Sequence, residues 1–293
     1  PRRDETHRDG GKGFHIRGRH QDGLRPLHRR IARQFREFDV VTDAQRHPKP
    51  TQFNHFGQGL TGAELGSIDI TEQIESTHAA FEAGATICHA HVRTADGTPT
   101  AAPDRFARLQ EGLRQHCPGM IVQFSTGGRS GAGRNRGGML PLRPDMASLS
   151  VGSNNFPNRV YENPPELVDW LAEEMMTYSV LPEIEVFDLS HILQAKAMAD
   201  AGKIPSRPYI QFVMGVKNAM PADRDVFDFY IQTVKRLFGD IPWCAAGIGR
   251  HQAELNAWCA AAGGHLEVVK FLAEKGSIAL NGISLTINKV ENN

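Results

Sequence analysis

Two histidines spaced two residues apart form the clearest candidate for metal chemistry in this chain of 293 residues. His89 and His91 lie in the short apolar segment TICHAHV, residues 86–92, which is typical of a strand. Alternate residues of a strand point to one face, so the two imidazoles can converge on one metal ion. Zinc suits imidazole nitrogen, and a catalytic zinc keeps one position open. Two histidines satisfied by hydrogen bonds are the alternative interpretation.

A run of small polar residues closes the next apolar segment, residues 121–125. The run is Ser125, Thr126, Gly127 and Gly128. Hydroxyl groups and open backbone N–H groups at a strand end can form a nest for an anion. A carboxylate or a phosphate would fit there, whereas the alternative is an ordinary turn between a strand and a helix.

Further polar side chains share faces of later strands. Ser148 and Ser150 point to one face of the predicted strand 146–151.

Glu185 lies in PEIEVFD, and a carboxylate in an apolar barrel mouth has a raised pKa that suits acid–base work. Arg250 follows the predicted strand 243–248 and could stabilise developing negative charge. A solvated glutamate and a surface arginine are the alternatives.

The long glycine- and arginine-rich segment 129–143 does not predict a dinucleotide site. After Gly131 and Gly133, the third glycine of the fingerprint would fall at residue 136, which is an arginine. A nicotinamide cofactor is therefore not expected. A loop of this length is more often functional or mobile.

The elements that must position these residues alternate between strands and helices. Six predicted strands cover residues 86–92, 121–125, 146–151, 184–189, 209–214 and 243–248. The predicted helices cover residues 74–83, 104–115, 164–176, 192–201, 222–237 and 251–261. Such alternation predicts a parallel α/β sheet, and six units in a row favour a TIM-type (β/α)8 barrel. An open doubly wound sheet is the alternative. In barrels the C-terminal strand ends, where the candidate residues lie, carry the active site.

Composition excludes several classes of protein. Lys and Arg number 33 and Asp and Glu also number 33, which argues against chain-wide binding of nucleic acid or anionic membrane. No run of 18 apolar residues predicts a membrane span, and no secretory signal is visible. The four cysteines lie far apart, so we expect a reducing cytoplasm and no cysteine-based zinc site. Residues 1–60 predict a basic, low-order extension, with a polyanion-binding arm as the alternative.

Several motifs in order resemble one known family. They are HAHVR (89–93), QFSTGG (123–128), ASLSVGSNNFPNRVYENPPELV (147–168), PEIEVFDLSHI (182–192), PYIQFVMGVKNAMPA (208–222), GIGRHQ (247–252) and GGH (263–265). Over roughly residues 70–265 the chain resembles the β-keto acid cleavage enzymes, the family of 3-keto-5-aminohexanoate cleavage enzyme. The resemblance implies a zinc-dependent TIM barrel, usually a homo-oligomer, here expected to be a dimer or a tetramer. Its expected reaction joins a β-keto acid and acetyl-CoA in a retro-Claisen-type exchange that yields acetoacetate and a new acyl-CoA.

The resemblance also implies roles for individual residues. His89 and His91 match two zinc ligands, Ser125, Gly128 and Ser148 match positions that hold the keto acid's carboxylate, Glu185 matches a site glutamate, and Arg250 matches the arginine of a G-x-G-R motif. Zinc would polarise the 3-keto oxygen, and a carboxylate base would start the carbon–carbon cleavage.

The segment after GGH departs from the family pattern. The positions of the family's arginine, third zinc ligand and catalytic base are here Glu267, Phe271 and Leu272. A third ligand would have to come from elsewhere, such as Glu64, Glu254 or Glu267. The alternative function is therefore a catalytically impaired barrel of the same family that binds a metal or an anion.

Both ends of the predicted barrel domain, residues 61–265, look unusual. No apolar first strand precedes residue 61, so the barrel is expected to be incomplete or atypical at its first and last strands. Residues 265–275 predict a helix, and residues 278–290 predict a hairpin with its turn at Asn281-Gly282. Within the C-terminal segment 266–293, AEKGSIALNGISLTINKVE resembles a riboflavin synthase segment, and HLEVVKFLAEKG resembles the second helix of an ankyrin repeat.

Overall fold

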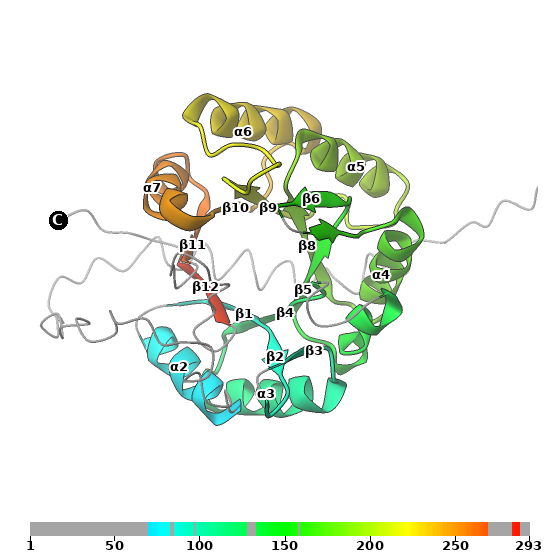
Figure 1. Cartoon of the computed structure of the whole chain (residues 1–293), viewed down its shortest axis with the longest axis vertical. Coiled ribbons are helices and arrows are strands. Elements are labelled where there is room, and N and C mark those ends of the chain that lie inside the picture. The colour runs from blue at the N-terminus through cyan, green and yellow to red at the C-terminus, as the bar shows by residue number, and fades with distance from the viewer. Residues whose placement is uncertain are drawn as a thin grey trace, which may run out of the picture.

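Eight strands close into a barrel in the computed structural model, which describes residues 70–82, 85–96, 98–127, 133–157, 159–268 and 283–287. Their order around the barrel is β1-β12-β11-β10-β9-β8-β5-β4 (Figure 1). The strands are β1 (Ile87–Ala90), β4 (Ile121–Phe124), β5 (Met146–Ser150), β8 (Leu181–Val186), β9 (Tyr209–Met214), β10 (Trp243–Gly247), β11 (His265–Val268) and β12 (Ile283–Ile287). The predicted TIM-type barrel is confirmed, and the open doubly wound alternative is wrong.

Helices form a ring outside the strands (Figure 1). They are α2 (Ile70–Glu82), α3 (Pro103–His116), α4 (Pro165–Thr177), α5 (Leu189–Asp200), α6 (Arg224–Phe238) and α7 (Gln252–Ala261). Local sequence explains how several of them begin. Prolines stand in the first turns of α3 and α4, where the missing N–H is tolerated. Asp188 caps α5, since its side chain accepts a hydrogen bond from the Ser190 N–H.

The core has two layers because alternate strand residues face opposite sides of the barrel wall. Residues such as Cys88, Val122 and Ala147 belong to the large cluster between wall and helices, together with Phe106 and Tyr230. A second, separate cluster lies inside the barrel at the strand beginnings: Ile87, Ile121, Met146, Leu181, Tyr209 and Cys244. Burial on both faces explains why the strands read as nearly continuous apolar runs.

The barrel interior becomes polar toward the C-terminal strand ends. Two residues beyond the inner apolar cluster, the same inward-facing side of each strand carries His89, Gln123, Ser148, Glu183 and Gln211. The last four of these side chains are buried, and Gln211 Nε2 donates to Glu183 Oε2 at 3.4 Å. A further step of two residues along β4, β5 and β8 reaches Ser125, Ser150 and Glu185. Because every second residue of a strand points inward, these candidate residues lie at the barrel mouth.

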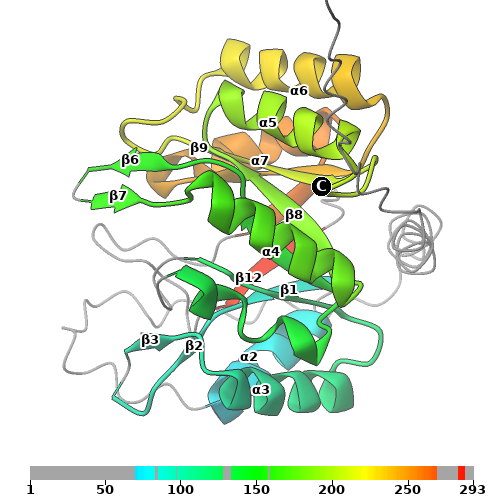
Figure 2. The same cartoon turned by 90° about the vertical axis from the view of Figure 1, so that its right-hand side faces the viewer.

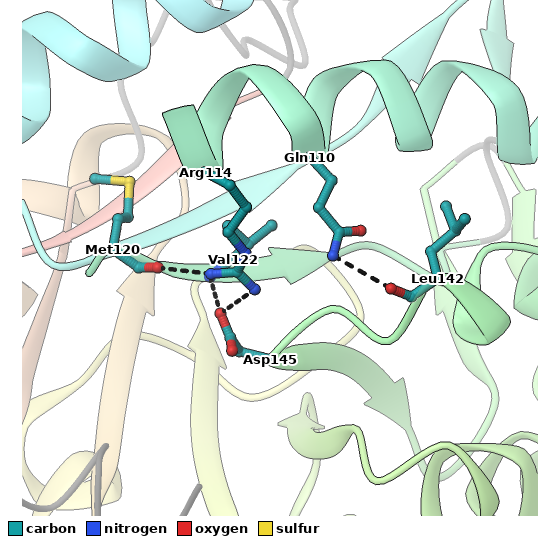
Figure 3. Close-up of polar contacts among 6 residues, drawn as sticks. All are labelled: Gln110, Arg114, Met120, Val122, Leu142 and Asp145. Atoms are coloured by element: carbon teal, nitrogen blue, oxygen red, sulfur yellow. Dashed lines mark hydrogen bonds and ion pairs between the residues drawn. The ribbon is translucent and has the colours of Figure 1, made fainter. Parts of the chain in front are cut away.

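An ion pair at the opposite end ties α3 to the strand beginnings (Figure 3). Arg114 Nη2 lies 2.8 Å from Asp145 Oδ2, and the same oxygen accepts the Val122 N–H at 2.9 Å. Arg114 Nη1 also donates to the Met120 carbonyl, and Gln110 donates to the Leu142 carbonyl. These bonds fix the helix against β4 and the start of β5.

Short elements complete the mouth of the barrel. Two hairpins project from the same end of the barrel (Figure 2). One pairs β2 (Val92–Arg93) with β3 (Pro99–Thr100), and the other pairs β6 (Asn154–Phe156) with β7 (Arg159–Tyr161). Two 3₁₀ helices follow strands at this end, η2 (Gly133–Gly137) after β4 and η4 (Gly249–His251) after β10. A further one in the described residues, η3 (Leu140–Leu142), leads into the start of β5.

The closing strands differ from the sequence expectation. The predicted helix 265–275 is wrong at His265–Val268, which form β11 and pair parallel with β10, because the barrel seam supplies partners for its backbone groups. Residues 269–275 lie outside the described residues, as do the 1–60 extension and the turn at Asn281-Gly282. The strand Ile283–Ile287 runs antiparallel to both β1 and β11. The expected atypical closure of the barrel is confirmed by this antiparallel strand.

Sequence boundaries of the other elements agree with the structure to within a few residues. Helix α2 begins four residues earlier than predicted, at Ile70 rather than residue 74. Both ends of β8 are displaced, since it covers Leu181–Val186 where residues 184–189 were predicted. Pro182 at the second position masks the start of this strand, since proline is rare inside a sheet. None of the helices that the structure describes is long and apolar enough to cross a membrane.

Candidate active site

The histidine pair has the geometry of two ligands on one metal ion. β1 directs the His89 side chain into the barrel, and His91 follows one residue after the strand ends. The two Nε2 atoms lie 3.3 Å apart. Two nitrogens bound to a tetrahedral zinc at the usual Zn–N length would lie about 3.3–3.4 Å apart. This separation fits one edge of a zinc coordination tetrahedron, and it equally fits a hydrogen bond between the two rings.

The environment keeps His89 in the form that binds metal. Burial lowers the pKa of His89 to about 4, while the neighbouring Gln123 side chain opposes this shift. The imidazole is therefore neutral at physiological pH, as metal ligation requires. His89 Nδ1 and Gln123 Nε2 are buried, and neither has an aligned hydrogen-bond partner among the described residues. The position of His91 is fixed by Gln73 of α2, which donates to the His91 carbonyl at 2.8 Å.

His89 and His91 are two candidate metal ligands, and the described residues add no third one beside them. No group of three or more His, Cys, Asp or Glu side chains in the described part of the chain could hold a metal ion. Glu254 lies on the exposed side of the first turn of α7. Glu64 and the side chain of Glu267 lie outside the described residues. A metal site here needs a ligand beyond those that the structure describes.

The polar run after β4 folds into a nest with its hydroxyl groups partly satisfied. The Gly127 N–H donates to Ser125 Oγ at 3.0 Å, and the Thr126 N–H donates to Ser148 Oγ at 3.1 Å. Thr126 Oγ1 donates to the Ser148 carbonyl at 2.6 Å. Because Ser125 and Ser148 accept through oxygen, each hydroxyl keeps its proton for a further acceptor. Gly128 lies outside the described residues.

Gly127 brings the nest and the histidine pair into one site. A methyl group at this position would lie 3.0 Å from Ser125 Oγ, 3.8 Å from His91 Cε1 and 4.0 Å from Tyr161 Oη. A single added carbon atom at Gly127 would thus contact side-chain atoms of Ser125, His91 and Tyr161. A ligand carboxylate in the nest would lie beside the histidine pair.

Glu185 lies on β8, two strands from β4 around the barrel, in a chain of hydroxyl groups. Its Oε2 accepts a hydrogen bond from Ser150 Oγ, and Ser150 Oγ lies 3.2 Å from Tyr161 Oη. Burial raises the pKa of the Glu185 carboxyl, and the Ser150 hydrogen bond and the charge of Arg136 partly oppose the rise. A carboxyl whose pKa is raised is a better candidate for proton transfer than an exposed glutamate.

Arg250 is placed differently from the other predicted residues. It lies in η4 directly after β10, as expected, but its side chain is exposed and its Nε lies 3.4 Å from His251 Nε2. The structure does not bring it into contact with the described residues of the nest or of the Glu185 chain.

Three site residues were missed by sequence reasoning: Arg136, Tyr161 and Asn163. Arg136 is buried in η2. It lies inside the glycine-rich segment 129–143, for which the sequence predicts only that no dinucleotide site is present. Tyr161 and Asn163 lie in the VYENPP part of a quoted motif. Two of the missed residues, Arg136 and Tyr161, line a cleft of about 350 Å³ between η2, β7 and the start of α4. Tyr161 and Asn163 lie within a motif that resembles the family. Their spacing in the sequence, however, does not show which side chains they contact.

The match to a family model and the matches to individual proteins point to the same group of enzymes. A family model described as beta-keto acid cleavage enzyme matches residues 68–268. The chain is 64% identical over 198 residues to 3-oxoadipate:acetyl-CoA acetyltransferase of Cupriavidus necator, covering 68% of this chain and 70% of that protein. It is 35% identical over 201 residues to 3-keto-5-aminohexanoate cleavage enzyme of Fusobacterium nucleatum, covering 68% and 72%.

Solved structures support the fold alone. The ternary complex of ObcA with C4-CoA adduct and oxalate matches with a TM-score of 0.57 at 16% identity, covering 68% of this chain. The apo structure of ObcA matches with a TM-score of 0.58. The chain spans about half the length of these structures, since 55% and 53% of them are covered.

Proposed function

The chain belongs to the beta-keto acid cleavage enzyme family, and we propose that it catalyses a zinc-dependent acyl exchange between a β-keto acid and acetyl-CoA. The observation that carries the proposal is that a Cβ atom placed on Gly127 would lie 3.0 Å from Ser125 Oγ and 3.8 Å from His91 Cε1, so the nest lies beside the histidine pair. A β-keto acid has a carboxylate and a keto oxygen separated by one methylene group. Two adjacent sites, one for an anion and one for a Lewis acid, match that spacing.

The proposed reaction exchanges the acyl groups of the two substrates. The bond between C2 and C3 of the keto acid breaks, and the released acyl group forms a thioester with CoA. The acetyl group joins the two-carbon carboxylate fragment, so that acetoacetate forms. No oxidant or reductant is needed, because one C–C bond and one thioester are broken and one of each is made.

The nest supplies the proposed site for the keto acid's carboxylate. The Ser125 and Ser148 hydroxyl groups each retain a proton to donate, and the N–H groups of Gly127 and Thr126 hold these two hydroxyl groups in place. Charge-assisted hydrogen bonds to a carboxylate are stronger than neutral ones. The nest therefore orients the substrate with its keto group toward the histidine pair.

The remaining residues have proposed roles in charge and proton handling. Zinc held by His89 and His91 would act as a Lewis acid on the 3-keto oxygen. Glu185, held through Ser150, is the proposed acid–base group. Arg250 is proposed to stabilise negative charge from the β10 side of the mouth. A homo-oligomer stays a prediction.

3-Oxoadipate is the first keto acid to test, since the 64% identical relative is named for it. We expect acetoacetate and a new acyl-CoA to form only when both substrates are present. Protein purified without chelator should retain about one zinc per chain, as a site with three protein ligands would. Absence of exchange with 3-oxoadipate and with other β-keto acids would contradict the proposal.

A catalytically impaired barrel is the second candidate. It is favoured by the two-ligand geometry of the described residues and by Phe271 and Leu272 at positions where the family pattern predicts a ligand and a base. Binding of a β-keto acid without turnover, and without retained zinc, would support this candidate.

A further inference from the structure

Arg136 is a buried cation bonded only to neutral groups. Its residue is 2% exposed. Nε donates to the Thr126 carbonyl at 2.5 Å, and Nη1 donates to the Glu162 carbonyl at 2.8 Å. Nη2 donates to Asn163 Oδ1 at 2.7 Å and to Tyr161 Oη at 3.3 Å. These bonds hold the guanidinium in one orientation.

The charge of Arg136 has no direct counter-ion in the described part of the chain. Its acceptors are two backbone carbonyls, one amide oxygen and one phenol. A buried charge is costly unless it is paired or solvated by dipoles. The positive field of Arg136 therefore remains available to anions at the mouth of the barrel.

One branch of hydrogen bonds leads from Arg136 to the nest. The Thr126 carbonyl, which accepts from Arg136, belongs to the same peptide unit as the Gly127 N–H. That N–H donates to Ser125 Oγ at 3.0 Å. Hydrogen bonds in a chain polarise one another, so the cation strengthens each donor along it. The last donor is the Ser125 hydroxyl, which faces the site.

A second branch leads from Arg136 to Glu185. An arginine only donates and a carboxylate only accepts, while each hydroxyl has one proton. Ser150 gives its proton to Glu185, so Tyr161 must donate to Ser150 and accept from Arg136. Cation and carboxylate are thus joined through two hydroxyl groups rather than in contact.

We propose that Arg136 is a positioning residue that sets both the anion nest and the Glu185 carboxylate through these two branches. The proposal rests on the proposed function and deepens it. It assigns the substrate's carboxylate as the anion that the buried guanidinium attracts. Arg136 does not touch that carboxylate; it acts through the Thr126–Gly127 peptide and Ser125.

The first test compares Arg136→Gln with Arg134→Gln. Arg134 lies in the same 3₁₀ helix, but it is exposed and lies over the Trp170 ring at 5.2 Å. Calorimetry with acetoacetate as the probe measures carboxylate binding without turnover. We expect Arg136→Gln to weaken binding about tenfold, because the Ser125 donor loses the polarisation that the buried cation supplies. Arg134→Gln should bind as the unaltered chain does.

The second test separates the branches. Tyr161→Phe removes the hydroxyl link to Ser150 and leaves the bond from Arg136 to Thr126. We expect it to move the acid limb of kcat/KM for 3-oxoadipate to higher pH, with acetoacetate affinity unchanged. The groups that act on Glu185 are Arg136 from η2 and, through Ser150, Tyr161 from β7; its register neighbours are Ser150 on β5 and Gln211 on β9. Arg136→Gln should move the limb in the same direction, and Arg136→Lys should restore it in part.

Two outcomes would overturn the proposal. One is acetoacetate binding by folded Arg136→Gln, checked by circular dichroism, that equals that of Arg134→Gln. The other, should Arg136→Gln not fold, is a Tyr161→Phe protein whose pH limb matches that of the unaltered chain. If the unaltered chain binds acetoacetate but does not turn over, the proposed function fails while the binding comparison still decides the role of Arg136.

Discussion

Two arginine–carboxylate systems at opposite ends of the barrel are built in opposite ways. At the strand beginnings Arg114 contacts Asp145 directly at 2.8 Å. At the strand ends Arg136 reaches Glu185 only through Tyr161 and Ser150. The first system cancels its charges and ties α3 to the wall. The second keeps its charges apart at the end where barrels carry chemistry. From this difference we expect the first system to act on stability, and we propose that the second acts on a ligand.

The largest expected effect at the strand ends is loss of metal. His89→Ala removes one of two nitrogens that lie 3.3 Å apart, so retained zinc should fall from about one per chain to near zero. Elemental analysis after dialysis measures this. His78→Ala, an exposed change on α2, is the matched control and should keep its zinc. If the His89→Ala protein retained about one zinc per chain, the metal would be bound at another site.

Loss of the acid–base group comes next. Glu185→Gln keeps the shape and still accepts from Ser150, but it cannot take a proton. We expect kcat to fall by about 10²–10⁴-fold with little change in melting temperature. The exposed Glu173→Gln on α4 serves as the control in the same steady-state assay. Unchanged kcat in Glu185→Gln would remove this residue from the mechanism.

The sequence predicts those candidate site residues that combine a reactive side chain with an alternate position near a strand end. His89, His91, Ser125 and Glu185 are all predicted, because each lies at an alternate position near a strand end and the barrel brings such ends together. It missed Arg136, since a buried arginine in a glycine-rich loop gives no periodic signal. Its partners Thr126 and Tyr161 lie 10 and 25 residues away.

The closing strands were predicted least well. The apolar spacing of HLEVV suits a helix as well as a strand, and only pairing with β10 decides between them. Arg250 was predicted correctly in position, after β10. Its exposure depends on the conformation of η4, which a motif does not specify.

The ion pair at the strand beginnings should affect stability and not catalysis. Asp145→Asn breaks the contact with the half-exposed Arg114, so we expect the free energy of unfolding to fall by about 1–3 kcal/mol. Denaturant unfolding measures this, and kcat/KM should be unchanged. Asp169→Asn removes an exposed pair with Lys203 and should change the free energy by less than about 1 kcal/mol. A large loss of activity in a folded Asp145→Asn protein would contradict the claim that this ion pair affects only stability.

A smaller effect is expected for a single nest hydroxyl. Ser125→Ala removes one donor to the keto acid's carboxylate and should raise KM for 3-oxoadipate about tenfold with kcat little changed. Steady-state kinetics measures both constants. Ser190→Ala, an exposed serine at the start of α5, is the control. An unchanged KM in Ser125→Ala would place the carboxylate outside the nest.

The smallest expected effect is a displaced pH limb. Burial raises the pKa of Glu185, so its ionised form is lost at a higher pH than for an exposed glutamate. If the carboxylate is the base, kcat/KM should fall as pH drops through this raised value. The limb should be absent from the residual activity of Glu185→Gln. Persistence of the same limb in that variant would assign it to another group.

The fate of the acetyl carbons tests the central claim most directly. The unaltered protein would be given 3-oxoadipate and acetyl-CoA labelled with ¹³C at both acetyl carbons, and the products analysed by mass spectrometry. Acyl exchange predicts both labels at C3 and C4 of acetoacetate and none in the new acyl-CoA. Label in the new acyl-CoA, release of labelled acetate, or no acetoacetate at all would contradict the account.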